Sequence, residues 1–251
     1  MKTRIIETPV RRNWIARHRL VSFFVLAYAL AWCMVPFGQF QAVGALIAAV
    51  IVIAVADGRS GFSDLGRRLI KWRVPWYYYA FALLVPLVVR AVSSGLNDAP
   101  GPDWAHLSWS SFALWFLVRM VNPLDGPMAE EPSFRGFAVP HLPARLRSAA
   151  LLGVLVAGWH LPLAAEIGVA GFGSTFVITF VYVWLFHRTG GSVLLTLIFH
   201  SAQGFITFTD LGYSGAGLVR QEWIELAAWT IVALTLVVTD RDAFRRPVDA
   251  A

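Results

Sequence analysis

Residues 20–56 decide the fold: they read LVSFFVLAYALAWCMVPFGQFQAVGALIAAVIVIAVA, 37 residues without one charged side chain. A helix on the surface of a soluble protein needs a polar face, and this stretch has none. It is too long for one membrane crossing, which takes about 20 helical residues, but it has the length of two. Pro36, Gly38, Gln39 and Gln41 mark the turn between the two crossings.

The rest of the chain continues this composition. Of its 251 residues 57% are apolar and 14% are charged, against about 45–50% and about 25% in soluble domains. Six more apolar stretches follow, at 75–96, 107–124, 148–165, 171–186, 190–209 and 223–239. The sequence therefore predicts an all-α fold, a polytopic integral-membrane helical bundle of about eight transmembrane helices, with residues 1–251 forming a single membrane domain.

The basic residues predict how the bundle is oriented. Lys and Arg gather in short loops on the cytoplasmic side, and an N-terminus inside places 18 of the 21 there. Only Arg220 falls outside, while Arg90 and Arg119 lie in or near spans, where each is expected to snorkel or to pair with a neighbouring span. We expect both termini in the cytoplasm, with 1–19 and 241–251 as cytoplasmic segments, and the plasma (inner) membrane as the location.

This topology accounts for the net charge of +6, so nucleic acid is not an expected partner, whereas the lipid bilayer is. The triplet Ala27-Tyr28-Ala29 resembles a signal-peptide cleavage site, but the apolar run continues beyond it, which favours a retained helix. Residues 62–73 place Leu65, Leu69 and Trp72 at helical spacing among cations, which predicts a short amphipathic helix on the inner leaflet.

Two adjacent carboxylates follow a broken stretch with prolines at 123 and 127. On a helix, Glu131 and Arg135 share a face because they are four residues apart, while Glu130 points elsewhere. This spacing predicts a paired structural carboxylate beside a free reactive one. Pro132 makes a helix that starts at this proline equally compatible with the sequence. A solvated turn at the membrane surface is the alternative for all three charged residues.

Two histidines lie inside apolar stretches. His160 and His200 stand 12 and 10 residues from the expected cytoplasmic ends of their spans, which places both about 15–18 Å deep. A single membrane histidine is more often a hydrogen-bonding helix contact than a catalyst. Two imidazoles at matching depth, together with an unpaired Glu130, indicate one site.

A carboxylate and an imidazole together can remove a proton from water, and a second imidazole can donate to the oxyanion formed at a carbonyl. The same three side chains, Glu130, His160 and His200, could instead bind zinc with an open position for water. The sequence leaves both open, so zinc is a possible cofactor. Nucleophilic catalysis is poorly supported, because Cys33 has no nearby His and no Gly-x-Ser-x-Gly motif is present.

At this point three motifs in order resemble those of the CPBP intramembrane proteases, the family of CAAX prenyl endopeptidases and bacteriocin-processing or immunity (Abi) proteins. The motifs are Glu130-Glu131-x-x-x-Arg135 with Gly136 and Pro140, then Trp159-His160-Leu161-Pro162, then Arg188-Thr189-Gly190-Gly191-Ser192 leading to His200. The resemblance covers residues 60–208, the expected protease core. It implies a helical endopeptidase whose cavity opens to the cytoplasm and whose substrate is a membrane-associated peptide or protein.

By motif position, the resemblance implies that Glu130 and His160 activate water, that His200 stabilises the oxyanion, and that Glu131 and Arg135 support the site. The chain departs from the family pattern at Val156, where Phe is usual. It departs again at Gly204, where Asn or Asp is usual. Losing one oxyanion donor typically costs about 10²–10³ in rate, so either the adjacent Gln203 substitutes through local distortion, or the enzyme is slow or inactive.

Two other functions remain open at this stage. One is a non-catalytic membrane immunity or peptide-binding protein of the same fold, which the loss of Asn or Asp at 204 favours. The other is a transporter with Glu130 and the histidines as a proton relay, against which the absence of internal repeats weighs.

Overall fold

The computed structural model describes residues 14–98, 108–204 and 206–245, and within these ranges the chain is helical and contains no β-strand. The all-α prediction is therefore confirmed. The α-helices are α1 (Trp14–Arg17), α2 (Arg19–Trp32), α3 (Val43–Ala56), α4 (Gly58–Leu69), α5 (Trp76–Gly95), α6 (Trp109–Val121), α7 (Gly126–Glu130), α8 (Leu146–Trp159), α9 (Ala164–Arg188), α10 (Val193–Gly204) and α11 (Gly215–Thr239). A π-helix, η3 (Glu131–Ala138), continues α7, and short 3₁₀ turns are η1 (Val35–Phe37), η4 (Val139–His141), η5 (Leu161–Leu163) and η6 (Arg241–Phe244). Most of the expected segments 1–19 and 241–251 lie outside the described residues.

Each of the eight expected apolar stretches contains a helix. Four helical segments are long and apolar enough to cross a bilayer alone: Arg19–Phe37, Trp76–Gly95, Leu161–Arg188 and Gly215–Thr239. Three apolar helices, α3, α8 and α10, are shorter, with 12 to 14 residues, which span only about 18–21 Å of a hydrocarbon core about 30 Å thick. A helical membrane bundle is thus confirmed, while eight full crossings stay a prediction.

One expected boundary is wrong. The apolar stretch 148–165 does not form a single helix, because α8 ends at Trp159 and a 3₁₀ turn with Pro162 follows. Proline cannot continue the hydrogen-bond ladder of the preceding turn. The next helix, α9, then bends at Gly168, whose φ of 56° is open to glycine at little cost. His160 therefore lies at the end of a helix rather than inside one.

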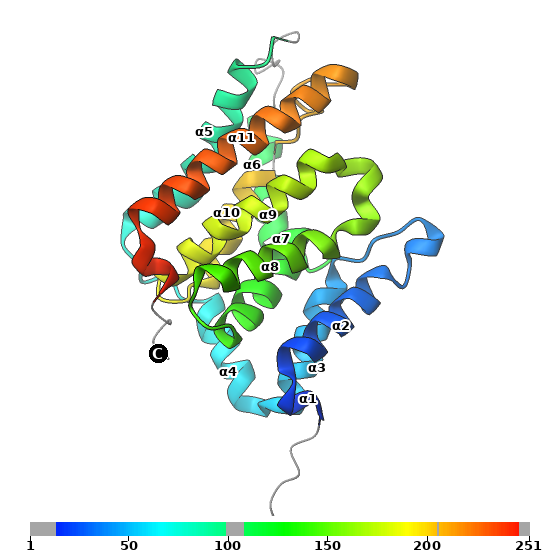
Figure 1. The fold of residues 1–251 in the computed structure, drawn as a ribbon, viewed down its shortest axis with the longest axis vertical. Coiled ribbons are helices and arrows are strands. Elements are labelled where there is room, and N and C mark those ends of the chain that lie inside the picture. Colours follow the sequence, from blue (N-terminus) through cyan, green and yellow to red (C-terminus); the bar gives the residue numbers. More distant parts are fainter. Residues whose placement is uncertain (1–13, 99–107, 205, 246–251) are drawn as a thin grey trace, which may run out of the picture.

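Some helices pack against their neighbours in the chain, and others pack against helices that are distant in sequence. Helix α2 lies along α3, while α9 packs against both α8 and α11, and α5 packs along α10 (Figure 1). Helices α2 and α3 approach closely at Gly44, where a Cβ would stand 2.5 Å from the backbone nitrogen of Ala31. Small residues allow such close approach between membrane helices.

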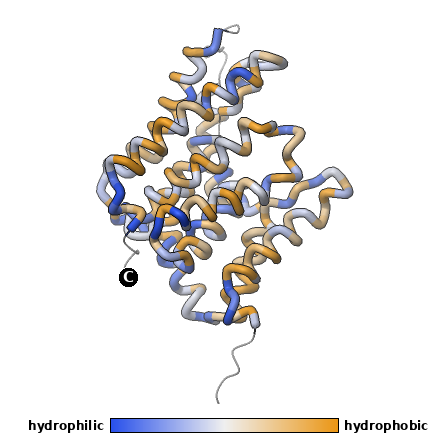
Figure 2. Tube along the Cα trace, viewed as in Figure 1, coloured by the Kyte–Doolittle hydropathy of each residue, from blue (hydrophilic) through white to orange (hydrophobic). Residues whose placement is uncertain are grey.

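Apolar residues make up most of these helices, and hydrophilic residues gather mainly at the helix ends and in the connections (Figure 2). Aromatic rings fill the interior between α2, η3 and α8: the ring of Phe134 lies 5.9 Å from that of Phe23 and 5.3 Å from that of Trp159. This packing holds η3 in the centre of the bundle, where all eight of its residues are buried.

The expected amphipathic helix 62–73 is displaced toward the N-terminus, since α4 covers Gly58–Leu69. Leu65 is its buried residue, and contacts between α4, α3 and η3 hold the helix against the bundle; its place on the inner leaflet stays a prediction. Trp72 lies beyond the helix and is exposed, so the prediction is right about the helix and wrong about its C-terminal end.

Candidate active site

The two carboxylates lie on a continuous helical segment that begins at α7. Asp125 caps this helix, because its Oδ1 accepts a hydrogen bond of 2.7 Å from the backbone N–H of Gly126. The helix passes through Pro132 and widens into the π-helix η3, where the N–H of Val139 donates to Phe134 O, five residues earlier. Of the two readings of Pro132, a helix beginning at this proline is therefore wrong. Short π-segments of this kind occur frequently at functional sites.

Glu131 is paired through one of its two carboxylate oxygens, with partners from two elements, while its Oε2 is buried without a hydrogen bond. Its Oε1 lies 3.0 Å from Arg135 Nη1 and 2.8 Å from His200 Nδ1, and both Glu131 and Arg135 are buried. The guanidinium of Arg135 also lies over the ring of Tyr182, 3.9 Å from its centroid. A carboxylate that accepts from Nδ1 fixes the tautomer and the orientation of the imidazole, so His200 is left with Nε2 for other contacts.

Glu130 points to the other side, as the spacing predicts. It is only 6% exposed, yet no hydrogen bond to its carboxylate is found within the described residues. Its nearest polar partner is His160, whose Nε2 lies 3.7 Å from Glu130 Oε1. The other ring nitrogen of His160 donates to Val156 O at 2.9 Å, which directs Nε2 toward the carboxylate.

Gly126 brings Glu130 and His200 close to each other. A Cβ on this glycine would stand 3.0 Å from Glu130 Oε1 and 3.8 Å from His200 Nε2. The missing side chain therefore keeps a small space open between the free carboxylate and the second imidazole. Sequence analysis missed Gly126, because nothing in a single glycine indicates which side chains lie around it.

One cavity of about 630 Å³ connects these groups. Glu130, His160 and His200 all line it, and so does Gln203, which lies on the same face of α10 as His200 because the two are three residues apart. The helix is continuous to Gly204, so Gln203 reaches the cavity without the local distortion considered in one of the two alternatives. The hydroxyl of Tyr182 donates to Gln203 Oε1 at 3.0 Å, which leaves the amide N–H groups free to donate.

Residues 108–206 match the family model described as "Type II CAAX prenyl endopeptidase Rce1-like". This match confirms the resemblance to the CPBP intramembrane proteases. The Rce1-like region contains all six site residues that the sequence singles out: Glu130, Glu131, Arg135, His160, His200 and Gln203. In a search of curated proteins, no match to the chain was found.

At the position where the resembled family usually carries Asn or Asp, the Rce1-like region of this chain places an arginine from another helix. A Cβ on Gly204 would stand 2.6 Å from Nη2 of Arg119, so the guanidinium occupies the space that a side chain at 204 would need. Arg119 Nη1 lies 3.4 Å from Asp125 Oδ2. The departure at Gly204 is therefore coupled to the residue that caps α7, the helix that carries Glu130.

A second pair of buried charges lines the same cavity. Arg90 Nη1 lies 3.2 Å from Glu225 Oε2, and the two residues are 8% and 6% exposed. Arg90 also donates to Gln203 O at 3.3 Å and lies over the ring of Phe208. Of the two expectations for Arg90, pairing with a neighbouring span is correct. The signal that could have identified its partner is a second intramembrane charge, Glu225.

Zinc binding needs three or four ligand atoms at about 2.0–2.3 Å from one point. Within the described residues, no three His, Cys, Asp or Glu side chains gather closely enough to hold a metal ion. His200 contacts Glu131 with one ring nitrogen and lies near Gly126 with the other. This arrangement does not form a ready ligand set, and zinc binding stays a prediction.

Proposed function

We propose that the chain is an intramembrane endopeptidase that hydrolyses a peptide bond of a membrane-associated peptide or protein at the cytoplasmic side. The family match supports a CAAX-type protease fold. The observation that carries the proposal is the buried carboxylate of Glu130, which has no hydrogen bond within the described residues and lies at a cavity with two oriented imidazoles. A buried carboxylate without a hydrogen bond is costly, and a reaction that uses it gives a reason for its presence.

In the proposed reaction, a water between Glu130 and His160 gives up a proton to the carboxylate, while its oxygen attacks the carbonyl carbon of the peptide bond. The gap of 3.7 Å between Glu130 Oε1 and His160 Nε2 leaves the two groups close enough to share one water. The oxyanion then accepts hydrogen bonds from the amide of Gln203 and from His200 Nε2. For Nε2 to donate, His200 must carry a proton on both ring nitrogens in this step, because its Nδ1–H already donates to Glu131. When the carbon–nitrogen bond breaks, Glu130 returns the proton to the leaving amine.

The paired residues would prepare this site rather than react. Glu131 and Arg135 hold His200 from behind, so that its free nitrogen faces the cavity. Tyr182 holds the carbonyl oxygen of the Gln203 side chain, so that the amide N–H groups are available to the substrate. Groups held in advance in this way lower the barrier without reorganising during the reaction.

The decisive variant is Glu130→Gln, which keeps the size of the side chain and removes the base. We expect cleavage of a membrane-associated peptide by the reconstituted protein to fall by about 10²–10⁴, the typical contribution of a general base or acid. Products are identified by mass spectrometry, and Glu222→Gln, which neutralises a half-buried carboxylate of the same cavity, is the matched control. Unchanged cleavage by a folded Glu130→Gln protein would contradict the proposal.

Zinc content is measured on the same purified protein. One equivalent of zinc that is lost together in His160→Ala and His200→Ala would assign these residues as ligands and would replace the direct activation of water described above. Substoichiometric zinc that the variants do not change would support activation by Glu130 and His160.

A non-catalytic peptide-binding or immunity protein of the same fold is the second candidate. It is favoured by Arg119, whose guanidinium fills the space beside Gly204 where the resembled family has an additional donor. Peptide binding that survives both Glu130→Gln and His160→Ala, without any product from the unchanged chain, would favour this candidate over the protease.

A further inference from the structure

A second cavity, of about 470 Å³, lies where the start of α8 meets the end of α11 and the turn η6. Three arginines line it: Arg145, which immediately precedes α8, and Arg241 and Arg245, which lie at the two ends of η6. None of the residues that line this cavity is acidic, and none belongs to the cavity of the candidate active site. We refer to it as the arginine pocket.

The three cations have no counter-ion in the described part of the chain. Neither Arg145 nor Arg241 nor Arg245 forms an ion pair with an acidic side chain there. Two acids flank Arg241 in sequence, Asp240 and Asp242, and neither lines the pocket. Asp240 already pairs with Arg188, and hydrogen bonds from this arginine hold the pKa of Asp240 below its usual value. Three like charges around one cavity repel each other, so an anion bound between them would stabilise this end of the bundle.

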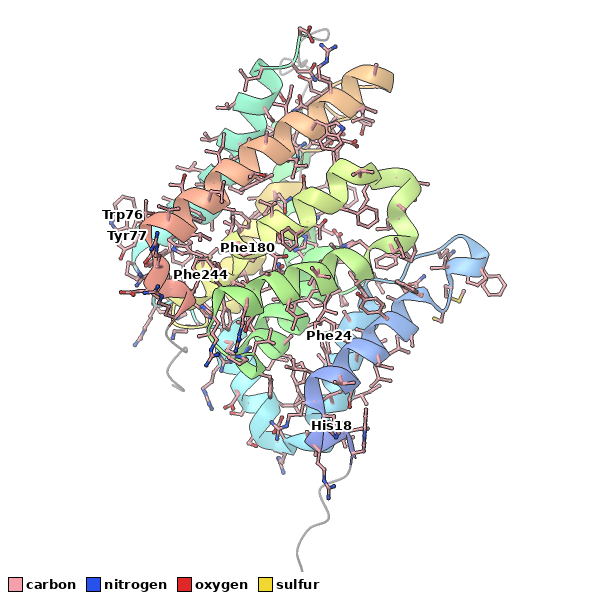
Figure 3. All side chains as sticks on the ribbon, in the orientation of Figure 1. His18, Phe24, Trp76, Tyr77, Phe180 and Phe244 are labelled. Atoms are coloured by element: carbon pink, nitrogen blue, oxygen red, sulfur yellow. The ribbon has the colours of Figure 1, made fainter. Side chains whose placement is uncertain are left out.

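The turn that carries two of these arginines is firmly attached to α9. Trp184 Nε1 donates to Asp240 Oδ2 at 2.7 Å, and His187 Nδ1 donates to Ala243 O at 2.6 Å. Phe244 is buried at the end of this turn, below α11 (Figure 3), and also lines the pocket. The turn that carries Arg241 and Arg245 is therefore fixed on α9, while the side chains of the three arginines are exposed at the mouth of the pocket.

The wall of the arginine pocket is apolar and faces outward. Leu146, Val237 and Val238 line it, and Leu146 and Val238 are exposed. The pocket also lies near the beginning of α5. Trp184, which donates to Asp240 beside Arg241, contacts Tyr78 of α5 with ring centroids 6.0 Å apart. Two neighbours of Tyr78, Trp76 and Tyr77, are exposed at this end (Figure 3), and exposed Trp and Tyr side chains mark the level of the lipid headgroups.

We propose that the arginine pocket binds the headgroup of an anionic phospholipid of the cytoplasmic leaflet. The phosphate would lie between the three guanidinium groups, which donate paired hydrogen bonds to phosphate oxygens. The acyl chains would follow the apolar wall along α8 and α11. The basic-residue distribution places all three arginines on the cytoplasmic side, and basic pockets on this side of membrane proteins bind anionic headgroups.

Native mass spectrometry of the purified full chain in detergent tests the proposal, with phosphatidylglycerol and phosphatidylcholine as probes. We expect one phosphatidylglycerol to stay bound under conditions that remove phosphatidylcholine. Each Arg→Gln substitution in the pocket should weaken the binding about fivefold, and the triple variant Arg145→Gln/Arg241→Gln/Arg245→Gln about a hundredfold. The corresponding triple Lys variant should keep most of the preference, because the charge is retained.

The matched control is a triple Gln variant of Arg17, Arg59 and Arg147, three exposed arginines outside the pocket, which should bind phosphatidylglycerol as the unchanged chain does. If the pocket variant does not fold, the three single variants report the same loss separately. Equal retention of both lipids, or an equal loss in the control, would overturn the proposal. Complete displacement of the lipid by inorganic phosphate would show a simple anion site and would overturn it as well.

Discussion

Two groups of buried charges line the same cavity, and only one of them is balanced. The Arg90–Glu225 pair contains one cation and one anion, 3.2 Å apart. The acid–histidine cluster of Glu130, Glu131, Arg135, His160 and His200 contains two carboxylates for one guanidinium, and Arg135 pairs with Glu131 alone. The unbalanced carboxylate, Glu130, lies beside two imidazoles, which are groups that can exchange protons with it.

The comparison separates charges that hold helices together from a charge that can react. In the Arg90–Glu225 pair, α5 and α11 supply one partner each, so the pair joins two helices. In the acid–histidine cluster, Glu131 and Arg135 play the same joining role toward His200 on α10. What the cluster has in addition is Glu130, and the proposed function depends on this excess.

The largest expected effect comes from removing the cation of the cluster. Arg135→Met leaves Glu131 buried with only His200 as a partner, and breaking a buried pair in this way costs about 3–5 kcal/mol. We expect a large fall in the melting temperature of the detergent-solubilised protein, together with loss of cleavage, because Arg135 no longer fixes the carboxylate that orients His200. Arg135→Lys, which keeps the charge, should recover part of both. A variant that melts like the unchanged chain would show that Glu131 finds another partner.

A smaller effect, on stability alone, is expected for the Arg90–Glu225 pair. Arg90→Met leaves Glu225 unpaired and should cost about 3 kcal/mol. The double variant Arg90→Met/Glu225→Leu removes both charges, and replacing a buried pair by apolar residues is often neutral. We therefore expect the double variant to melt near the unchanged chain. Cleavage by this variant, measured below its melting temperature, should stay within a few-fold of the original, unlike that of any variant of Glu130. Complete loss of cleavage would place the pair in the reaction.

Within the acid–histidine cluster, the sequence predicted the relations between neighbours on one helix much better than the contacts between separate helices. The spacing of Glu131 and Arg135 predicted their contact, and the neighbouring position of Glu130 predicted that it would point away, because both depend only on helical geometry. The closeness of Glu130 and His200 depends on Gly126, and the orientation of Gln203 depends on Tyr182. These relations come from the packing of separate helices, and no local pattern encodes them.

The same reason explains the wrong helix boundaries. Hydropathy indicated apolar stretches correctly, but it placed His160 inside a span, whereas the turn at Pro162 ends α8 just before it. Apolar composition does not distinguish a helix that crosses the membrane from one that stops within it. The proline was visible in the sequence and is the signal that could have corrected the boundary.

The smallest expected effect concerns Gly204, where the two groups of charges come closest in sequence, since Gln203 contacts Arg90 through its carbonyl oxygen. Gly204→Asn restores the residue type of the resembled family, but its Cβ would collide with Nη2 of Arg119. We expect this crowding to cost about 1–3 kcal/mol, seen as a lower melting temperature, because the guanidinium must leave Asp125.

The double variant Arg119→Ala/Gly204→Asn removes the collision and decides what the departure at 204 means. If Arg119 only fills space, the new amide can donate to the oxyanion, and kcat should rise above that of the unchanged chain while KM changes little. If kcat falls instead, Arg119 contributes to the reaction through Asp125 and α7, and Gly204 is an adaptation that admits it. Gly204→Ala, which adds the collision without the amide, is the control: it should lower the melting temperature like Gly204→Asn and should give no gain in kcat.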